Sequence, residues 1–571
     1  MKNTILAILA LLFILPAKSQ NEKFQINGAA RSYLFANALQ IDNSLDSITP
    51  KKSNYGHNLL DLGISVFPNA QTEVIGVFRI RNELGGFWGG GVTFNVRQLT
   101  LKGVANNVVR YEIGDIDLKM TPYTLFNTQE EGFINESDIF KVRRDILHYD
   151  LFYQENQWRM QGAKIDFNVL TNSIVKKTNV KGYLTRQKAS DGLSQPERLY
   201  GGGSFNFIGS SKFNFQINSA NMFDLTKTLG NDSTKFTNSI VTSNFNYKII
   251  NNENKSMKLS GEGGFSDTKY INNPNSNAPK ALSDWFYDLS SSTHIKKKKL
   301  RFTFGVKDIG KDFRSPGAQT KRINYSKSPG LYQQFTNNYI GREVTYSDII
   351  TGNADASFKL SETLMAYNAA YSNTNPFGDA TPNRRGVYVH LEGLDSVKIK
   401  NSFIKCLLLQ ESVGTGTLER KSFALTQLGT TIHLNQFLNL KKVLKINLGF
   451  QNEFTFRGGA AYEQINLSSN FIDAGVSFEF IPKLNLLFGT KLWIAKGNEN
   501  LIIRDEFNTV NDFKAIDINF SESIIAAGFK YDFDQKNTLT LQYQNFDLKN
   551  SSVDGIDYGI SEFNILYSLN F

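Results

Sequence analysis

Apolar and polar residues alternate at every second position along most of this chain. Segments 60–66, 474–480 and 484–494 place apolar residues on one register and mainly Gly, Ser, Asn or charged residues on the other. The C-terminal segment repeats the pattern, with an apolar and aromatic register made of Phe563, Ile565, Tyr567, Leu569 and Phe571. A period of two is typical of β-strands whose two faces meet different surroundings. The pattern therefore predicts an all-β chain.

The connections between these segments alternate between short and long. Short turns are predicted at 68–71, 209–211, 361–362, 481–483 and 534–536. Long loops rich in Asn, Ser and Gly are predicted at 37–56, 119–145, 223–238, 267–283, 310–349, 496–512 and 547–558. Transmembrane barrels have short turns on the periplasmic side and long loops outside. We therefore predict a large closed antiparallel transmembrane β-barrel with about 24 strands, within a range of roughly 18 to 26.

Closure of the barrel follows from the chemistry of the lipid. A soluble sandwich also alternates, but its domains close after roughly 100 residues. Here the pattern continues from Phe24 to Phe571 without a linker-like change in composition. Hydrocarbon offers no hydrogen-bond partner to a strand edge, and each unsatisfied backbone group costs several kcal/mol. The first strand, predicted at 24–35, must therefore pair with the last, predicted at 559–571.

The N-terminus has the features of an export signal. Lys2 precedes an apolar stretch at 4–15 that is too short to span a bilayer. Ala17 and Ser19 supply the small residues of a cleavage site. We predict that residues 1–19 form a cleavable signal peptide and that residues 20–571 form a single barrel domain. The only cysteine is Cys406, so this junction offers no residue for a lipid anchor.

Composition excludes several other classes of protein. Of the 571 residues, 40% are hydrophobic and 13% aromatic, which is too apolar for a disordered chain. A single cysteine excludes a disulfide scaffold. Beyond the first 16 residues no apolar run approaches the ~20 residues of a transmembrane helix. Loss of Lys2 and Lys18 lowers the formal charge from +10 to +8 (10 minus 2), which does not indicate a nucleic-acid partner.

The C-terminal sequence FNILYSLNF, which ends in Phe571, resembles that of Gram-negative outer-membrane β-barrel proteins of the porin-like kind. The Ser19-Gln20 junction and the abundance of Asn, Lys, Phe and Ile resemble proteins of the Bacteroidota. The resemblance implies an integral outer-membrane location, in contact with outer-membrane lipid and lipopolysaccharide. It also implies that the barrel-assembly machinery recognises the last strand through Phe563, Ile565, Tyr567, Leu569 and Phe571. No motif identifies a specific family.

Residues 114–145 combine acidic and basic groups and are the candidate constriction of the lumen. Wide barrels enclose open channels unless loops or plugs fill them. We predict that this segment folds inward and sets acids against bases across the pore, as charged rings do in channels. The alternative is a mobile extracellular loop with solvated charges. The candidate pore residues are Asp115, Asp117, Glu130, Glu131, Arg143 and Arg144, with Arg110 and Glu112 on the preceding strand.

Three further charged regions have weaker interpretations. Arg79 and Arg81 are candidates for the lumen face, although Ile75 and Val77 share their register. The run Lys296–Lys299 falls at a predicted periplasmic turn, where a solvated role is expected. The loop 310–349 carries basic and aromatic residues and is predicted to be a long extracellular loop, either a lid or a docking surface.

Catalysis and cofactor binding are not predicted. The five histidines lie on separate segments, none in the H-E-x-x-H spacing of a zinc site, and no G-x-S-x-G elbow is present. The glycine runs at 85–91 and 200–203 lack the Lys-Ser/Thr of a phosphate-binding loop. A strand-like segment begins at Phe24, which leaves no room for the globular plug of a TonB-dependent transporter. We predict no enzyme activity, no metal and no cofactor.

The sequence favours a passive or weakly selective channel for the diffusion of small hydrophilic solutes. The alternative is a barrel that does not transport and whose long loops dock surface lipoproteins or secretion and assembly machinery. Stepwise conductance after reconstitution would favour the first function. Silence in bilayers together with co-purifying lipoproteins would favour the second.

Overall fold

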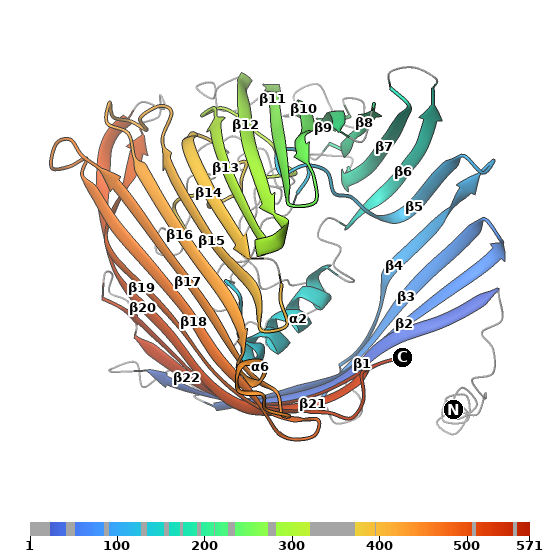
Figure 1. Ribbon diagram of the computed structural model, residues 1–571, viewed down its shortest axis with the longest axis vertical. Helices are drawn as coiled ribbons and strands as arrows, with labels where there is room; N and C mark the ends of the chain where they lie inside the picture. The colour runs from blue at the N-terminus through green and yellow to red at the C-terminus, as the bar shows by residue number, and fades with distance from the viewer. Residues whose placement is uncertain are drawn as a thin grey trace.

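The alternating segments pair with their neighbours along the chain and curl into a ring of strands, as the computed structural model shows (Figure 1). All neighbouring strands are antiparallel, and 22 of them form one sheet. The structure describes residues 23–41, 52–84, 91–126, 134–152, 159–171, 175–190, 196–209, 212–225, 235–271, 281–319, 372–393, 395–504, 510–551 and 557–571. The predicted signal peptide lies outside these residues.

The strands follow the sequence order around the barrel. The first half comprises β1 (Phe24–Ile41), β2 (Lys52–Asn69), β3 (Thr72–Glu83), β4 (Val92–Ala105), β5 (Val109–Asp117), β6 (Arg159–Leu170), β7 (Lys177–Lys188), β8 (Arg198–Ile208), β9 (Phe213–Asp224), β10 (Lys235–Asn251) and β11 (Lys255–Ile271). The second half comprises β12 (Ala281–Ile295), β13 (Leu300–Ile309), β14 (Arg384–Gly393), β15 (Ile399–Gln410), β16 (Ser422–His433), β17 (Leu444–Arg457), β18 (Ile465–Ile481), β19 (Leu484–Arg504), β20 (Val510–Asp532), β21 (Asn537–Asn550) and β22 (Tyr558–Asn570). The helices of the described residues are α2 (Asp138–Phe152), α6 (Leu434–Leu438) and the 3₁₀ helix η2 (Lys296–Lys298).

The first and last strands close the barrel. β1 and β22 pair antiparallel from Ala29 opposite Asn570 to Ile41 opposite Tyr558. The predicted pairing of the chain's two ends is therefore confirmed. Each of the 22 described strands has a partner on both sides, so none of them presents an unpaired edge to lipid.

The strand count is 22, within the predicted range but below the predicted number of about 24. The short turn predicted at 361–362 lies outside the described residues. β13 pairs directly with β14, from Leu300 opposite Gly393 to Ile309 opposite Arg384. These two strands are therefore neighbours in the sheet.

The two registers of each strand face different surroundings, as predicted. On β22, Phe563 and Tyr567 are 44% and 38% exposed, whereas Glu562, on the opposite register, is 1% exposed. The apolar register of β20 is also exposed, with Ile525 at 66%. The exposed apolar faces point outward to lipid, and the polar faces point into the lumen. Among the described residues, no helix has the length and apolarity needed to cross a membrane.

Short turns gather at the end of the barrel where the chain's C-terminus lies. The Gly28 amide donates to the carbonyl oxygen of Phe571 at 3.1 Å, which fixes the C-terminus beside β1. The turn between β20 and β21 is stabilised by Asp534, whose carboxylate accepts from the Lys536 amide at 2.7 Å. A hydrogen bond from the Asn537 side chain, together with this one, holds the pKa of Asp534 below its usual range. This end corresponds to the predicted periplasmic side.

An arginine at the exposed position Ile525 tests the lipid-facing assignment. Ile525→Arg is expected to lower the free energy of unfolding by about 2–4 kcal/mol, because it places a cation on the lipid face away from the strand ends. The matched variant Phe533→Arg adds the same charge at a short turn and is expected to cost at most ~1 kcal/mol. Urea-dependent unfolding from lipid vesicles measures both values. Equal costs would contradict the assignment.

Candidate functional site in the barrel lumen

The barrel is wide enough to need internal structure. Strands about 4.8 Å apart and tilted by about 40° give a circular barrel of this strand number a backbone radius of roughly 22 Å. Four described segments run inside it: 118–126, 134–152, 310–319 and 372–383. Figure 1 shows α2 within the ring of strands, and these segments together form the candidate functional site.

Helix α2 packs on one wall of the lumen through its first turn. Ile139 and Phe140 are buried in an apolar cluster whose other members come from the lumen faces of β19, β20 and β21: Leu487, Ile524, Ala526 and Phe546. The Asp138 carboxylate lies in the first turn, where the helix dipole favours a negative charge. The Ser137 amide donates to the Asp473 carboxylate at 3.2 Å. Local polarity and burial therefore fix both the start and the position of the helix.

Wall glycines make room for the chain that leads into α2. A Cβ atom at Gly449 would overlap the Ile134 carbonyl oxygen, and one at Gly475 would overlap the Ser137 side chain. Gly429 and Gly489, on the neighbouring strands β16 and β19, are also approached closely by this segment. Residues 134–139 therefore lie directly against the backbone of β16–β19.

Filling this contact is expected to displace the inward segment. Gly475→Val is expected to destabilise the packed state by about 1–3 kcal/mol, as overpacking does elsewhere. The expected readout is a noisier and larger single-channel conductance, because the start of α2 no longer seats on the wall. The matched variant is Gly458→Val, since a Cβ at Gly458 meets nothing within 4 Å. Identical traces for the two variants would contradict the close contact.

Charged contacts hold the start of α2 to β17, β18 and β19. The Glu136 carboxylate pairs with Lys491, and both side chains are buried. Lys445 donates to Asp138 at 2.7 Å, and the hydroxyl of Ser477 also donates to Asp138. Buried ion pairs of this kind require close geometry because each charge has lost its water. The start of α2 is therefore fixed at defined atoms of the wall.

The rest of α2 reaches two other parts of the wall. Arg143 donates to Glu562 of β22 at 3.2 Å. The Tyr149 hydroxyl donates to Asp61 of β2 at 2.6 Å. The backbone carbonyl oxygen of Tyr149 accepts from Arg97 of β4 at 2.8 Å. The helix is thus attached to β17–β19 at its start, to β22 along its length, and to β2–β4 near its end. These strands fall within one consecutive run around the ring, so α2 lies inside the barrel along one sector of the wall.

Segment 118–126 is held on the wall opposite β22. Tyr123 stacks on Phe286 with ring centroids 4.2 Å apart, and its hydroxyl donates to Asp288 at 2.7 Å. Burial raises the pKa of Tyr123 well above its usual range, so the hydroxyl stays protonated and keeps donating. Thr121 donates to Glu262 of β11 at 2.6 Å. This segment narrows the lumen beside β11 and β12.

The described ends of the long β13–β14 connection also lie inside the barrel. Ser315 is fully buried and donates to the Tyr123 carbonyl oxygen at 2.8 Å. The amides of Asn373 and Thr374 donate to one oxygen of Glu453 at 2.9 and 3.0 Å. Residues 310–319 of the predicted extracellular loop are therefore packed in the lumen, and residues 320–349 lie outside the described part of the chain.

The structure separates the predicted pore residues into two groups and leaves two undescribed. Arg143 and Arg144 lie on α2, where Arg144 donates to Glu136 at 2.7 Å. The Asp115 carboxylate accepts from the Leu99 amide at 2.7 Å, which joins β5 to β4 away from α2. Asp117 is exposed at the end of β5. Glu130 and Glu131 lie outside the described residues. The acids and bases of 114–145 are therefore not one ring, because the chain turns between them.

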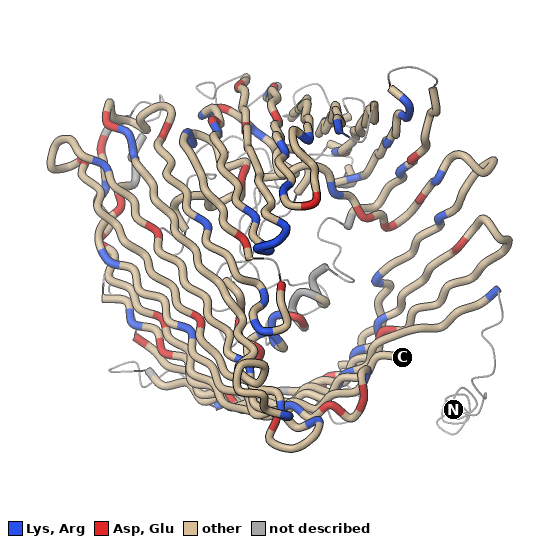
Figure 2. Tube along the Cα trace, viewed as in Figure 1, with Lys and Arg blue, Asp and Glu red and all other residues tan. Residues whose placement is uncertain are grey.

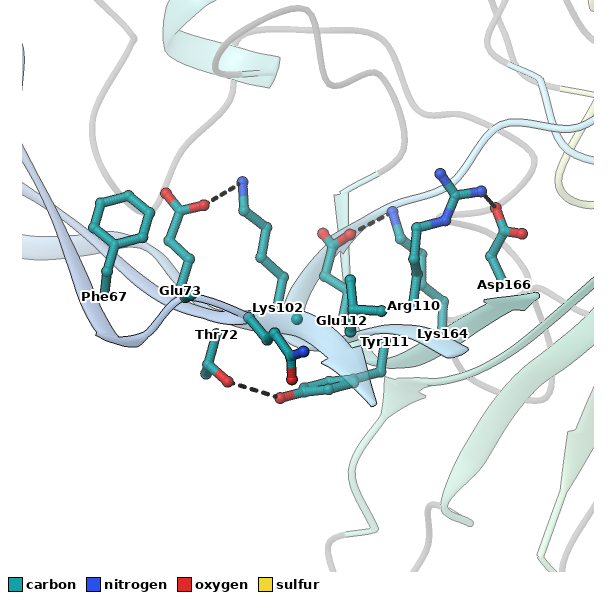
Figure 3. Close-up of a pocket in the computed structure, with 13 residues that line it drawn as sticks. Phe67, Thr72, Glu73, Lys102, Arg110, Tyr111, Glu112, Lys164 and Asp166 are labelled. Atoms are coloured by element: carbon teal, nitrogen blue, oxygen red, sulfur yellow. Dashed lines mark hydrogen bonds and ion pairs between the residues drawn. The ribbon is translucent and has the colours of Figure 1, made fainter. Parts of the chain in front are cut away.

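Arg110 and Glu112 line a cavity of about 470 Å³ near the short turns of β2–β6 (Figure 3). Arg110 pairs with Asp166 at 2.8 Å, and Glu112 pairs with Lys164 at 2.6 Å. Glu73 and Lys102 form a third pair at 2.9 Å. In Figure 3 the three pairs point to the same side of the sheet, which is the lumen side by register. Their charges balance, so this cavity is a polar but neutral part of the lumen.

Several residues that hold α2 were not singled out by the sequence analysis. Asp61, Glu562 and Lys491 were recognised only as members of the polar register. The missed signal is a charge in the middle of a strand, far from either turn. Such a charge faces the lumen at a depth where water is scarce, so it needs a fixed partner. The lumen-facing glycines of β16–β19 are a second such signal, because they mark where another segment lies directly against the wall.

Within the described residues, no group of three or more His, Cys, Asp or Glu side chains has the arrangement of a metal site. Cys406, the single cysteine, is half-buried on β15.

A scan of family models and a search of curated proteins found no match to this chain. Among solved structures, OccK11 (OpdR) of Pseudomonas aeruginosa is 8% identical over 97% of this chain and 99% of that chain, with a TM-score of 0.35. The translocation pore of the P pilus usher PapC is 8% identical over 95% and 99%, with a TM-score of 0.36. The OmpT variant lacking loop L8, an outer membrane protein of Vibrio cholerae, is 7% identical over 96% and 100%, with a TM-score of 0.26.

These similarities concern the fold alone. The chain is a closed transmembrane β-barrel, and barrels of the outer membrane stand among its structural neighbours. Its function has to be inferred from its own lumen.

Proposed function

We propose that this protein is an outer-membrane channel through which small hydrophilic solutes diffuse, and that α2 forms its constriction. The observation that carries the proposal is the attachment of α2 to three separate parts of the wall, at Lys491, Glu562 and Asp61. A helix is roughly 10–12 Å across with its side chains. Lying along one sector of the wall, it fills part of the cross-section and makes the lumen narrower than the barrel.

The polar character of the lumen supports solute passage. The inward register carries Gln, Asn, Ser, Thr and charged groups on most strands, and the cavity beside β3–β6 is lined by ion pairs. A hydrophilic solute entering such a lumen exchanges water for polar groups instead of meeting an apolar barrier. No covalent step is needed, and the mechanism is diffusion past fixed charges.

Reconstitution of the purified barrel into planar bilayers tests the proposal. We expect stepwise current increments and uptake of small sugars by proteoliposomes, with exclusion of polymers wider than the passages beside α2. Silence in both assays would overturn the channel. Docking of surface lipoproteins or secretion machinery by the outer loops stays a prediction, and silence together with a stable co-purifying lipoprotein would favour it.

A further inference from the structure

One cross-strand row of the lumen wall carries several cations and no carboxylate. The register aligns Lys248 with Lys258, then Ser292, Thr303, His390 and Lys405 across β10–β15. We call these six residues the lysine row. They share the inward register with buried neighbours such as Thr242, Ser266 and Leu407, so the row faces the lumen. An outward position would expose the same cations to hydrocarbon at about 2–4 kcal/mol each near the midplane.

The cations of the lysine row repel one another. Lys248 and Lys258 are direct partners on β10 and β11, with roughly 5 Å expected between their Cβ atoms. Like charges in directly opposed positions destabilise a sheet. Within the described part of the chain, neither lysine nor Lys405 has an ion-pair partner. Both Lys248 and Lys258 are exposed, so their ammonium groups can reach a solute.

The surroundings of the row extend the positive field toward the channel mouth. Arg301 lies one step nearer the short turns and is paired with Glu392 at 2.8 Å, which leaves the three lysines as the unbalanced charge. The turn between β12 and β13 is the run Lys296–Lys299, in which Lys297, Lys298 and Lys299 are exposed. In Figure 2 this turn is a continuous blue stretch, the colour of Lys and Arg, where β12 meets β13. The basic surface thus runs from the mouth onto the wall.

The wall formed by β3–β6 is a natural comparison. There the register aligns Glu73, Lys102, Glu112 and Lys164, and each acid is paired with a base. That row sums to zero charge, whereas the lysine row sums to +3 with His390 neutral. The excess charge therefore distinguishes β10–β15 from β3–β6.

We propose that the lysine row is a binding wall for small anionic solutes that carry a carboxylate or phosphate group. Lysine ammonium groups bind such groups as point charges. The Ser292 hydroxyl accepts from the Thr303 hydroxyl at 3.0 Å and offers its own proton as a hydrogen-bond donor between the lysines. The lysine row is expected to raise the local concentration of anions relative to cations. Clefts lined by one sign of charge do so by on the order of tenfold or more. This inference rests on the proposed channel and adds its preferred class of solute.

The decisive variant replaces three lysines of the row, as Lys248→Gln, Lys258→Gln and Lys405→Gln together. The wild-type channel in a KCl gradient is expected to give a reversal potential on the anion-selective side, and the triple variant is expected to lose most of it. Inorganic phosphate is the probe for binding: it should reduce chloride current through the wild type and not through the variant. The matched control removes three lysines from short turns between other strands, Lys441, Lys442 and Lys536.

The outcomes separate this inference from the channel itself. If the wild-type protein conducts but is cation-selective, the lysine row does not bind anions and the channel proposal is unaffected. The same conclusion follows if the triple variant keeps the selectivity of the wild type. If the wild-type protein does not conduct, titration calorimetry of phosphate binding to the detergent-solubilised barrel still tests the lysine row. Binding that is about tenfold weaker in the triple variant than in the control supports the wall, and equal binding overturns it.

Discussion

Deletion of residues 134–152 is expected to raise the single-channel conductance roughly twofold or more, because a helix of about 10–12 Å diameter leaves the lumen. The cutoff for polymer exclusion is expected to rise with it. A conductance increase without a larger cutoff would mean that the helix restricts charge and not size. The segment is replaced by a short Gly-Ser linker so that the strand order and register on both sides are kept.

The deletion needs a variant that leaves the helix in place. Lys141→Ala serves this purpose, since Lys141 is an exposed residue of α2. It is expected to leave conductance and cutoff unchanged. If the deletion variant does not fold, the double variant Arg143→Gln and Tyr149→Phe removes the contacts to Glu562 and Asp61 while keeping the helix. Wild-type conductance in the deletion variant or, where that variant does not fold, in the double variant would show that α2 is not the constriction.

The strands of this protein could be predicted from its sequence because each strand has one face in lipid and one in the lumen. Residues 474–480 show this directly: Ala474, Val476 and Phe478 were placed on one face from alternation alone, and they lie on the outward register of β18. Closure followed from the cost of an unpaired edge, and β1 does pair with β22. These features depend on local sequence and on the solvent, so a single sequence contains them.

The contents of the lumen were less accessible for a physical reason. Arg143 meets Glu562 across 419 positions of the chain, and Asn135 meets the Leu448 carbonyl across 313. Such contacts exist only after the barrel has closed and have no local periodicity. The prediction that 114–145 folds inward rested on its charges, yet Asp115 serves the β4–β5 pair while Arg143 serves the helix. Residue type alone does not separate those two uses.

The internal segments also show why a channel of this width keeps one shape. Each is held by polar groups on several strands of the wall, so no segment moves without leaving buried polar groups unmatched. Glu453 receives two amides of the β13–β14 connection, and Arg384 donates to the carbonyl oxygens of Asn373 and Thr374. Hydrogen bonds to charged groups contribute about 1.5–3 kcal/mol each. The described internal segments are therefore fixed in their positions on the wall.

Replacement of Asp61 by alanine is expected to be the most costly single substitution in the lumen. Its carboxylate accepts from Arg79 at 2.7 and 2.6 Å, from Arg97 at 3.2 Å and from Tyr149 at 2.6 Å. The side chain of Asp61 is 1% exposed, and those of Arg79 and Arg97 are almost as buried. Asp61→Ala removes the carboxylate that two buried guanidinium groups share. Removing one partner of a buried ion pair costs about 3–5 kcal/mol.

Two comparison variants separate the lost charge from the lost attachment of α2. Asp166→Ala removes the acid of the half-exposed pair with Arg110 and is expected to cost less than about 1 kcal/mol. Tyr149→Phe removes only the hydroxyl that α2 offers to Asp61, and is expected to cost about 1 kcal/mol while still increasing conductance. Unfolding in urea from lipid vesicles gives the stabilities, and bilayer recordings give the conductance. An Asp61→Ala variant as stable as Asp166→Ala would mean that Arg79 and Arg97 find other partners, and the end of α2 would then not depend on this carboxylate.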